Sequence, residues 1–145
     1  FIESRFRKSV KTIFKEIGED GFRRIEQSVL REVGEFQNVI IASGGGTPCF
    51  YDNMEYMNKT GITVYLETSV DCIFKRLTIP AAKAKRPLVA EKSDEELREF
   101  ISTALAARHD IYNSSQLIFN SEKLETAGQI KESAEKLFEK LKEVI

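Results

Sequence analysis

The sequence predicts an α/β domain built on a mostly parallel sheet, and three observations lead to that prediction. Segments of helical and of strand period alternate from near the start of the chain to its end, as they do where helices connect parallel strands. The first strand candidate, at residues 38–42, is a short apolar run bounded by turn signals, which suits a strand covered on both faces. The chain has 145 residues, enough for one domain with a hydrophobic core. We therefore interpret residues 1–145 as a single domain.

Two helices are expected before the first strand. Apolar side chains recur at helical spacing in residues 9–17, with Ser9 as a good N-cap and Gly18 at the end. Asp20 is expected to cap a second helix, which Gly34 closes.

Three short strands are expected, at residues 38–42, 62–67 and 117–119. The first runs directly into the triplet Gly44-Gly45-Gly46. Three strands are few for this much helix, so one or two further strands before Phe1 would make the sheet more convincing.

The remaining segments are helices and one loop. Ser69 caps a helix that runs to Leu77, and a capping box at residues 93–96 opens a long helix through Leu105. The pattern breaks at residues 78–92, which read as an exposed, mobile loop. A C-terminal helix is expected over about 127–144.

The composition gives no sign of a nucleic-acid or membrane partner. The chain has 22 basic and 23 acidic residues, so neither a nucleic-acid footprint nor a polybasic membrane patch is indicated. No apolar run reaches transmembrane length and no signal peptide is visible. Cys49 and Cys72 lie far apart and are expected to be reduced thiols of a cytoplasmic protein.

Two motifs are candidates for anion binding. Gly44-Gly45-Gly46 follows a strand, where ligands approach the backbone in open α/β sheets; a flexible turn is the alternative. Arg23 lies three residues before Glu26, and its planar fork suits a carboxylate or phosphate; a surface salt bridge is the alternative.

Further cations are ambiguous when each is taken alone. Arg86, in the irregular loop, has the character of a lid residue that reaches a transferring phosphoryl group, or of a solvated arginine. Arg76 and Arg108 occur in helices, where a cation also stabilises a C-terminus. His109, the only histidine, is interpreted as a surface residue.

The order of these motifs along the chain resembles that of shikimate kinases, from Ser4 nearly to the end. Any one motif is unspecific, whereas the set in this order is specific. The set comprises Gly18-Glu19-x-x-Phe22-Arg23-x-x-Glu26, Gly44-Gly45-Gly46, Arg76, Arg86-Pro87-Leu88 and Arg108-x-x-x-Tyr112.

The resemblance implies a P-loop NTPase fold like that of nucleoside-monophosphate kinases, with a five-stranded parallel sheet flanked by helices. The first strand or strands would be missing from the residues given. Shikimate-binding helices are expected at about residues 3–34 and a mobile lid at about 78–92.

The resemblance also implies the roles of individual residues. Arg23 and Arg108 would hold the shikimate carboxylate, with Glu26 orienting Arg23. Gly44, Gly45 and Gly46 would contact the ring hydroxyls. The catalytic lid residue Arg86 would reach the phosphates of ATP, and Arg76 would lie beside the nucleotide.

Two elements of the family pattern are not found in the chain: the Walker A loop and an Asp-x-Asp element, which precede the matched region. No other stretch offers a phosphate-cradling loop, and the acidic residues show no metal-ligand spacing, so no metal ligand is assigned. We expect the 145 residues to be part of a longer polypeptide; the alternative is a chain that lacks the loop.

The expected activity is transfer of the γ-phosphate of ATP, with Mg²⁺, to the shikimate 3-hydroxyl in a cytoplasmic monomer. Shikimate is the expected partner, with no nucleic acid and no membrane. A kinase for another small acid, such as gluconate, and a non-catalytic shikimate-binding module remain alternatives.

Overall fold

Capping side chains decide where several helices begin in the structure, a computed structural model that describes residues 1–79 and 92–144. Ser9 and Ser69 each accept a hydrogen bond from a backbone N–H in the first turn that follows, which satisfies one orphan donor of the helix. Ser93 and Glu96 form the reciprocal bonds of a capping box. The helix starts predicted at Ser9, Ser69 and the capping box of residues 93–96 are confirmed.

The chain divides into two compact units. The first comprises Phe1–Thr63 and Ser114–Gln116, and the second comprises Val64–Asn113 and Leu117–Ile145.

The first unit is helical among its described residues. It contains α1 (Ile2–Phe6), α2 (Val10–Gly34), the 3-10 turn η1 (Thr47–Cys49) and α3 (Asn53–Thr60). Helix α2 packs against α3 and η1, and one of its faces supplies most of the buried apolar side chains: Ile13, Phe22, Val29, Leu30 and Val33. The helical segment expected at residues 3–34 is therefore present, whereas α1 and α3 were not predicted as separate helices.

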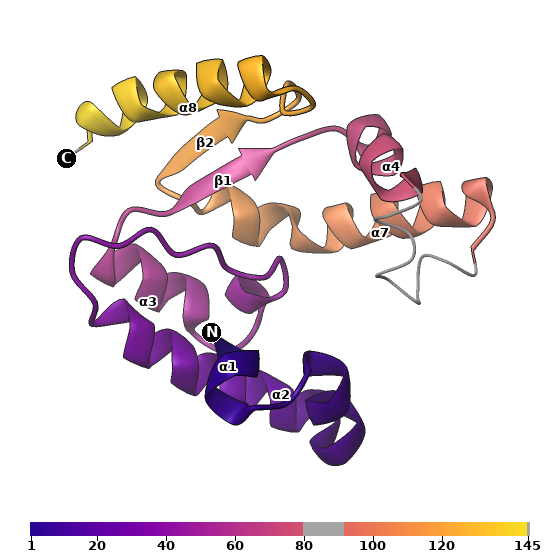
Figure 1. The fold of residues 1–145 in the computed structure, drawn as a ribbon, viewed down its shortest axis with the longest axis vertical. Helices are drawn as coiled ribbons and strands as arrows, with labels where there is room; N and C mark the ends of the chain where they lie inside the picture. Colours follow the sequence, from indigo (N-terminus) through magenta and orange to yellow (C-terminus); the bar gives the residue numbers. More distant parts are fainter. Residues whose placement is uncertain (80–91, 145) are drawn as a thin grey trace. The chain divides into compact units, whose positions relative to one another are not determined.

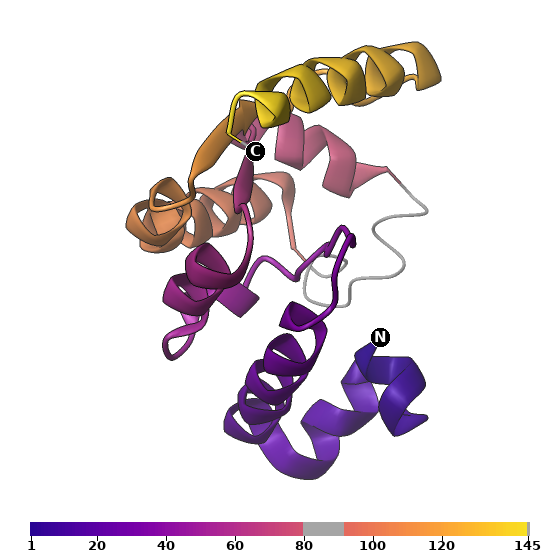
Figure 2. The same ribbon diagram turned by 90° about the vertical axis from the view of Figure 1, so that its left-hand side faces the viewer.

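A kink at Gly18 divides α2. Gly18 has φ 71° and ψ −176°, a conformation that glycine adopts without the steric cost of a Cβ. The helix resumes before Asp20, so the N-cap predicted at Asp20 is wrong. Figure 2 shows the change of direction within α2.

The second unit is a parallel sheet flanked by helices. Strand β1 (Val64–Glu67) pairs with β2 (Leu117–Asn120) in register Val64↔Leu117. Alternation places Leu66 and Phe119 on one face, towards α8 (Ala127–Lys142). Tyr65 on the other face contacts Tyr112 of α7 (Asp94–Asn113), with ring centroids 5.0 Å apart. Figure 1 shows α8 and α7 on opposite sides of the sheet.

The best-packed apolar cluster of the second unit joins α4 (Val70–Thr78) to α7. Leu97 is 0% and Ile101 5% exposed, and both pack against the apolar face of α4. The long helix expected from the capping box through Leu105, with Arg108 near its end, is present as α7 and extends to Asn113.

The strand predicted at residues 38–42 is wrong for this structure. These residues have no regular secondary structure, and Ile40 is 101% exposed. A strand requires a hydrogen-bonded neighbour, and no described residue pairs with this segment. Among the described residues the sheet therefore has two strands rather than the three predicted.

The described helices include none with the length and apolar character needed to cross a membrane.

Candidate functional site

Arg23, on α2, lies at the centre of a buried polar cluster in the first unit. Its Nη1 donates to Glu26 Oε2 at 2.8 Å and its Nη2 donates to Glu19 Oε1 at 3.3 Å. The side chains of Arg23 and Glu26 are 14% and 10% exposed, whereas that of Glu19 is 60% exposed. Because the Arg23–Glu26 pair is largely withdrawn from water, losing either partner is far more costly than at an exposed ion pair.

Two aromatic rings border the Arg23 guanidinium. Its Cζ lies 4.1 Å from the ring centroid of Phe50 and 5.5 Å from that of Phe22, both within range of a cation–π contact. The Nε of Arg23 is buried and makes no hydrogen bond with any described residue. A buried guanidinium donor without a partner is unusual, and a bound anion is one group that satisfies it.

The glycine triplet lies against this cluster. A Cβ added to Gly46 would be 3.0 Å from Arg23 Nη1, and one added to Gly44 would be 3.6 Å from Glu26 Oε1. The carbonyl of Gly45 accepts a weak hydrogen bond from Cys49 Sγ at 3.8 Å. The structure therefore brings together five of the predicted site residues: Arg23, Glu26, Gly44, Gly45 and Gly46.

Thr47 and Asn53 complete the cluster and were missed by the sequence analysis. Thr47 Oγ1 donates to Glu26 Oε1 at 2.6 Å, and Asn53 Nδ2 donates to the Thr47 carbonyl at 2.8 Å. They are 4% and 0% exposed. The position of Thr47 directly after the glycines was visible in the sequence, but its contact with Glu26 spans 21 residues and no local pattern reveals it.

Arg76, in the second unit, holds the loop that follows β2. Its Nη2 donates to the carbonyls of Ser121 and Glu122 at 2.7 and 3.0 Å. The sequence left open that Arg76 stabilises the C-terminus of its own helix, but both hydrogen bonds go to carbonyls outside that helix. They fix the loop backbone instead.

Glu122 ties the same loop to the start of α4. Its carboxylate accepts hydrogen bonds from the backbone N–H and the hydroxyl of Ser69 and from the hydroxyl of Thr68. The backbone N–H of Ser69 is the largest cause that holds the pKa of Glu122 below its usual value, opposed by some desolvation.

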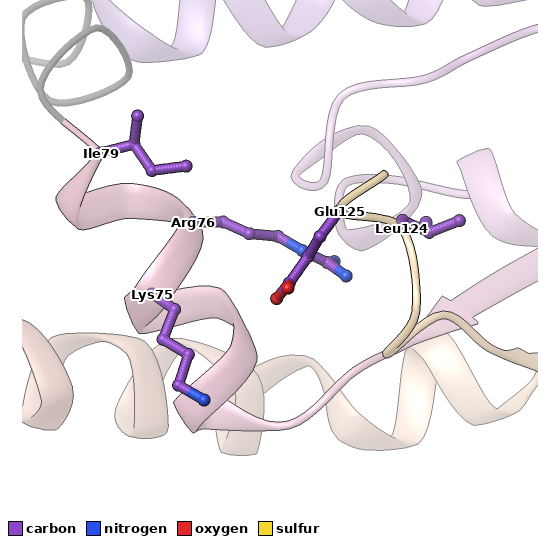
Figure 3. A pocket seen from close by; sticks show the side chains of 5 residues that line it. All are labelled: Lys75, Arg76, Ile79, Leu124 and Glu125. Atoms are coloured by element: carbon purple, nitrogen blue, oxygen red, sulfur yellow. The ribbon is translucent and has the colours of Figure 1, made fainter. Parts of the chain in front are cut away.

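An open cavity of about 450 Å³ lies beside Arg76. It is lined by Lys75, Arg76 and Ile79 from α4 and its C-terminal end, and by Leu124 and Glu125 from the loop after β2. Figure 3 shows these side chains around the cavity. The lining therefore combines two cations, two apolar side chains and one carboxylate, and the cations and apolar side chains are groups that can contact a nucleotide.

Arg108 lies on α7, in the second unit. It is partly buried and makes no hydrogen bond or ion pair with the residues that the structure describes. His109, the next residue, is exposed and contacts Asn113 one turn later, which confirms its interpretation as a surface residue.

Arg86 and most of the lid predicted at residues 78–92 fall on residues 80–91, outside the described residues. Within the described ranges, no group of three or more histidine, cysteine, aspartate or glutamate side chains is arranged to hold a metal ion. These described residues therefore do not form a protein cage for Mg²⁺.

Comparison with protein families gives one match that covers nearly the whole chain. The family model for shikimate kinase matches residues 1–142. The shikimate kinases of Phocaeicola vulgatus and Bacteroides thetaiotaomicron are each 50% identical to this chain over 141 residues, which are 97% of this chain and 79% of each relative.

Solved structures agree with the sequence relatives. The 1.7 Å crystal structure of the Bacteroides thetaiotaomicron shikimate kinase has a TM-score of 0.92 and 50% identity, over 97% of this chain and 79% of that one. The Acinetobacter baumannii shikimate kinase in complex with shikimate has a TM-score of 0.79 and 25% identity, over 98% of this chain and 75% of that one.

Proposed function

The chain belongs to the shikimate kinase family, and from that premise we propose that it transfers the γ-phosphate of ATP to the 3-hydroxyl of shikimate. Family membership makes it a phosphotransferase with the P-loop kinase fold, and it implies ATP as the phosphoryl donor. The residues that bind each substrate, the metal, the monomeric state and the cytoplasmic location are part of the proposal.

The proposal rests on which nitrogens of the Arg23 guanidinium lack a strong hydrogen-bond partner. Nη1 is committed to Glu26, whereas Nε has no partner among the described residues and Nη2 has only the longer contact of 3.3 Å to the exposed Glu19. Nε and Nη2 lie on one edge of the guanidinium, the fork that binds a carboxylate through two parallel hydrogen bonds. The shikimate carboxylate would take this edge and displace Glu19.

The glycine turn supports the same substrate. Without side chains at Gly44 to Gly46, a ring bound at Arg23 can approach the backbone closely. Arg108 is proposed as the second cation for the carboxylate, because it is partly buried and has no acidic partner in the described part of the chain. Two cations hold a small acid in one orientation, which is the main contribution that a phosphoryl-transfer enzyme makes towards its acceptor.

The nucleotide is proposed to bind in the second unit. Lys75 and Arg76 would face the nucleotide in the cavity beside the loop after β2. Arg86, on the proposed lid, would approach the phosphates and stabilise the charge that develops in the transition state, a contribution worth about 10³–10⁵ in rate for arginines of this kind. Mg²⁺ is proposed to arrive with the ATP phosphates, as is usual for a metal that keeps few protein ligands.

The test is shikimate-dependent release of ADP from ATP and Mg²⁺ by the complete polypeptide that the gene encodes. Gluconate and other small hydroxy acids are assayed in parallel, with no acceptor as the background. We expect turnover with shikimate and values of kcat/KM at least about tenfold lower with the other acids. Equal turnover with gluconate, or none with shikimate, would contradict the proposed acceptor.

A further inference from the structure

We infer that Thr47 is a positioning residue that keeps one edge of the Arg23 guanidinium available for the substrate carboxylate by holding Glu26. This inference rests on the proposed function, because it concerns how the same site receives its acid. Thr47 itself would not touch shikimate; it would act through Glu26.

The two oxygens of Glu26 have different partners. Oε1 accepts the hydroxyl of Thr47 at 2.6 Å and Oε2 accepts Arg23 Nη1 at 2.8 Å. Both are short, charge-assisted hydrogen bonds, the strong kind within proteins. The Arg23–Glu26 pair is therefore bound through one oxygen and one nitrogen.

An arginine and a carboxylate left to themselves favour the bidentate arrangement, with two parallel hydrogen bonds. If the Thr47 hydroxyl were absent, Oε1 would be a buried acceptor without a partner, which is costly. Arg23 is the other side chain that donates to Glu26 in the described part of the chain, so Glu26 would turn its second oxygen towards the guanidinium. The guanidinium edge needed for the substrate would then be occupied or rotated away.

Thr47 is itself held rigidly enough to act in this way. Its backbone N–H donates to the Gly44 carbonyl at 3.0 Å, and its own carbonyl accepts Asn53 Nδ2 at 2.8 Å. Thr47 and Asn53 are 4% and 0% exposed. A buried side chain with its backbone fixed on both sides presents its hydroxyl in one direction, which is what orienting a binding group requires.

The test compares Thr47→Val, which replaces the hydroxyl by a methyl group of similar size, with Thr47→Ser, which keeps the hydroxyl. Thr63→Val is the matched control. Thr63 is also buried in the first unit, but its hydroxyl contacts Asn58 and Gln116 and none of the residues around Arg23. Calorimetry gives the Kd for shikimate and for its carboxamide, which lacks the charged carboxylate, and thermal unfolding gives the Tm of each variant.

We expect Thr47→Val to raise the Kd for shikimate about tenfold or more, the equivalent of losing one hydrogen bond to a charged group. Thr47→Ser and Thr63→Val should stay within about threefold of the wild type. The Kd for the carboxamide should be the same for wild type and Thr47→Val, because that ligand makes no ionic contact with Arg23. Thr63→Val should lower the Tm without changing either Kd.

Three results would overturn the positioning role: an unchanged Kd for shikimate in Thr47→Val, an equal loss of affinity for the carboxamide, or a Thr47→Ser variant as weak as Thr47→Val. If Thr47→Val does not fold, Thr47→Ala removes the same hydroxyl without adding a methyl group at the buried position and is judged by the same three results. A wild-type protein that fails to bind shikimate would instead contradict the proposed function itself.

Discussion

Replacing Gly46 by alanine tests whether the fine position of Arg23 governs shikimate binding. The added Cβ would lie 3.0 Å from Arg23 Nη1, 3.1 Å from Nη2 and 3.3 Å from Cζ. All three distances are shorter than ordinary van der Waals contact, so the guanidinium must move by a few tenths of an ångström. Its hydrogen bond to Glu26 resists that movement.

Two opposing effects on stability limit the loss. Gly46 has φ −84° and ψ −25°, a helical conformation that alanine adopts without strain, and removing a glycine stabilises a protein by about 0.4–1 kcal/mol through the unfolded chain. Overpacking of a buried site costs about 1–3 kcal/mol. The net loss in the free energy of unfolding is therefore at most about 2–3 kcal/mol.

Shikimate binding should be weakened. A displaced guanidinium loses part of its hydrogen bonding to a carboxylate, which is worth about 1.5–3 kcal/mol for a charged group. We therefore expect the Kd and the KM for shikimate to rise about tenfold or more, with the KM for ATP unchanged.

The control is Gly61→Ala, at the end of α3, where an added Cβ meets no heavy atom within 4 Å. Calorimetry with shikimate and steady-state kinetics are run on both variants and the wild type. If Gly46→Ala binds shikimate as tightly as Gly61→Ala does, the close packing of the glycine turn on Arg23 has no part in binding and the reasoning is refuted.

Four further predictions concern the nucleotide site, the lid, the second arginine of the shikimate site and pH. Arg76→Ala removes both hydrogen bonds that fix the loop after β2 and should raise the KM for ATP about tenfold without changing that for shikimate; equal changes in both would contradict a nucleotide role. Arg86→Ala should lower kcat by about 10³-fold or more with shikimate affinity retained, and an unchanged kcat would contradict its lid role. Arg108→Ala should raise the KM for shikimate, and an unchanged KM would contradict its contact with the carboxylate. Because hydrogen bonds from Ser69 lower the pKa of Glu122 in the folded state, that carboxylate stabilises the fold above its unfolded-state pKa, and the stabilisation is lost as the pH falls through the folded-state pKa. Glu122→Gln should therefore lower the Tm at neutral pH and match the wild type in acid; a Tm difference that persists in acid would show that charge is not the cause.

Much of the helical structure could be predicted from the sequence because its signals are local. Ser9, Ser69 and the Ser93–Glu96 capping box each act within one helical turn, so the residues that form the cap are neighbours in the sequence. The break at Gly18 is also a local signal, because glycine itself readily adopts the positive φ found there.

The strand predicted at residues 38–42 failed because strands depend on partners far away. An apolar run of this length indicates a buried strand only if another strand lies beside it. The run at residues 117–119 has such a partner in β1, and there the prediction is confirmed.

Only the part of the candidate site that depends on local contacts could be predicted from the sequence. Arg23 and Glu26 are one helical turn apart, so their pairing follows from α2 alone. Phe50, Thr47 and Asn53 reach the cluster only through the packing of α2 against η1 and α3, which no periodicity in the sequence encodes.

Calorimetry with two ligands and two proteins tests whether Arg23 binds the carboxylate of shikimate. Shikimate and its carboxamide are titrated into the wild type and into Arg23→Ala. We predict that the wild type binds shikimate about tenfold or more tightly than the carboxamide and that Arg23→Ala loses most of this preference. An Arg23→Ala variant that still prefers shikimate by the wild-type factor would show that Arg23 does not bind the carboxylate.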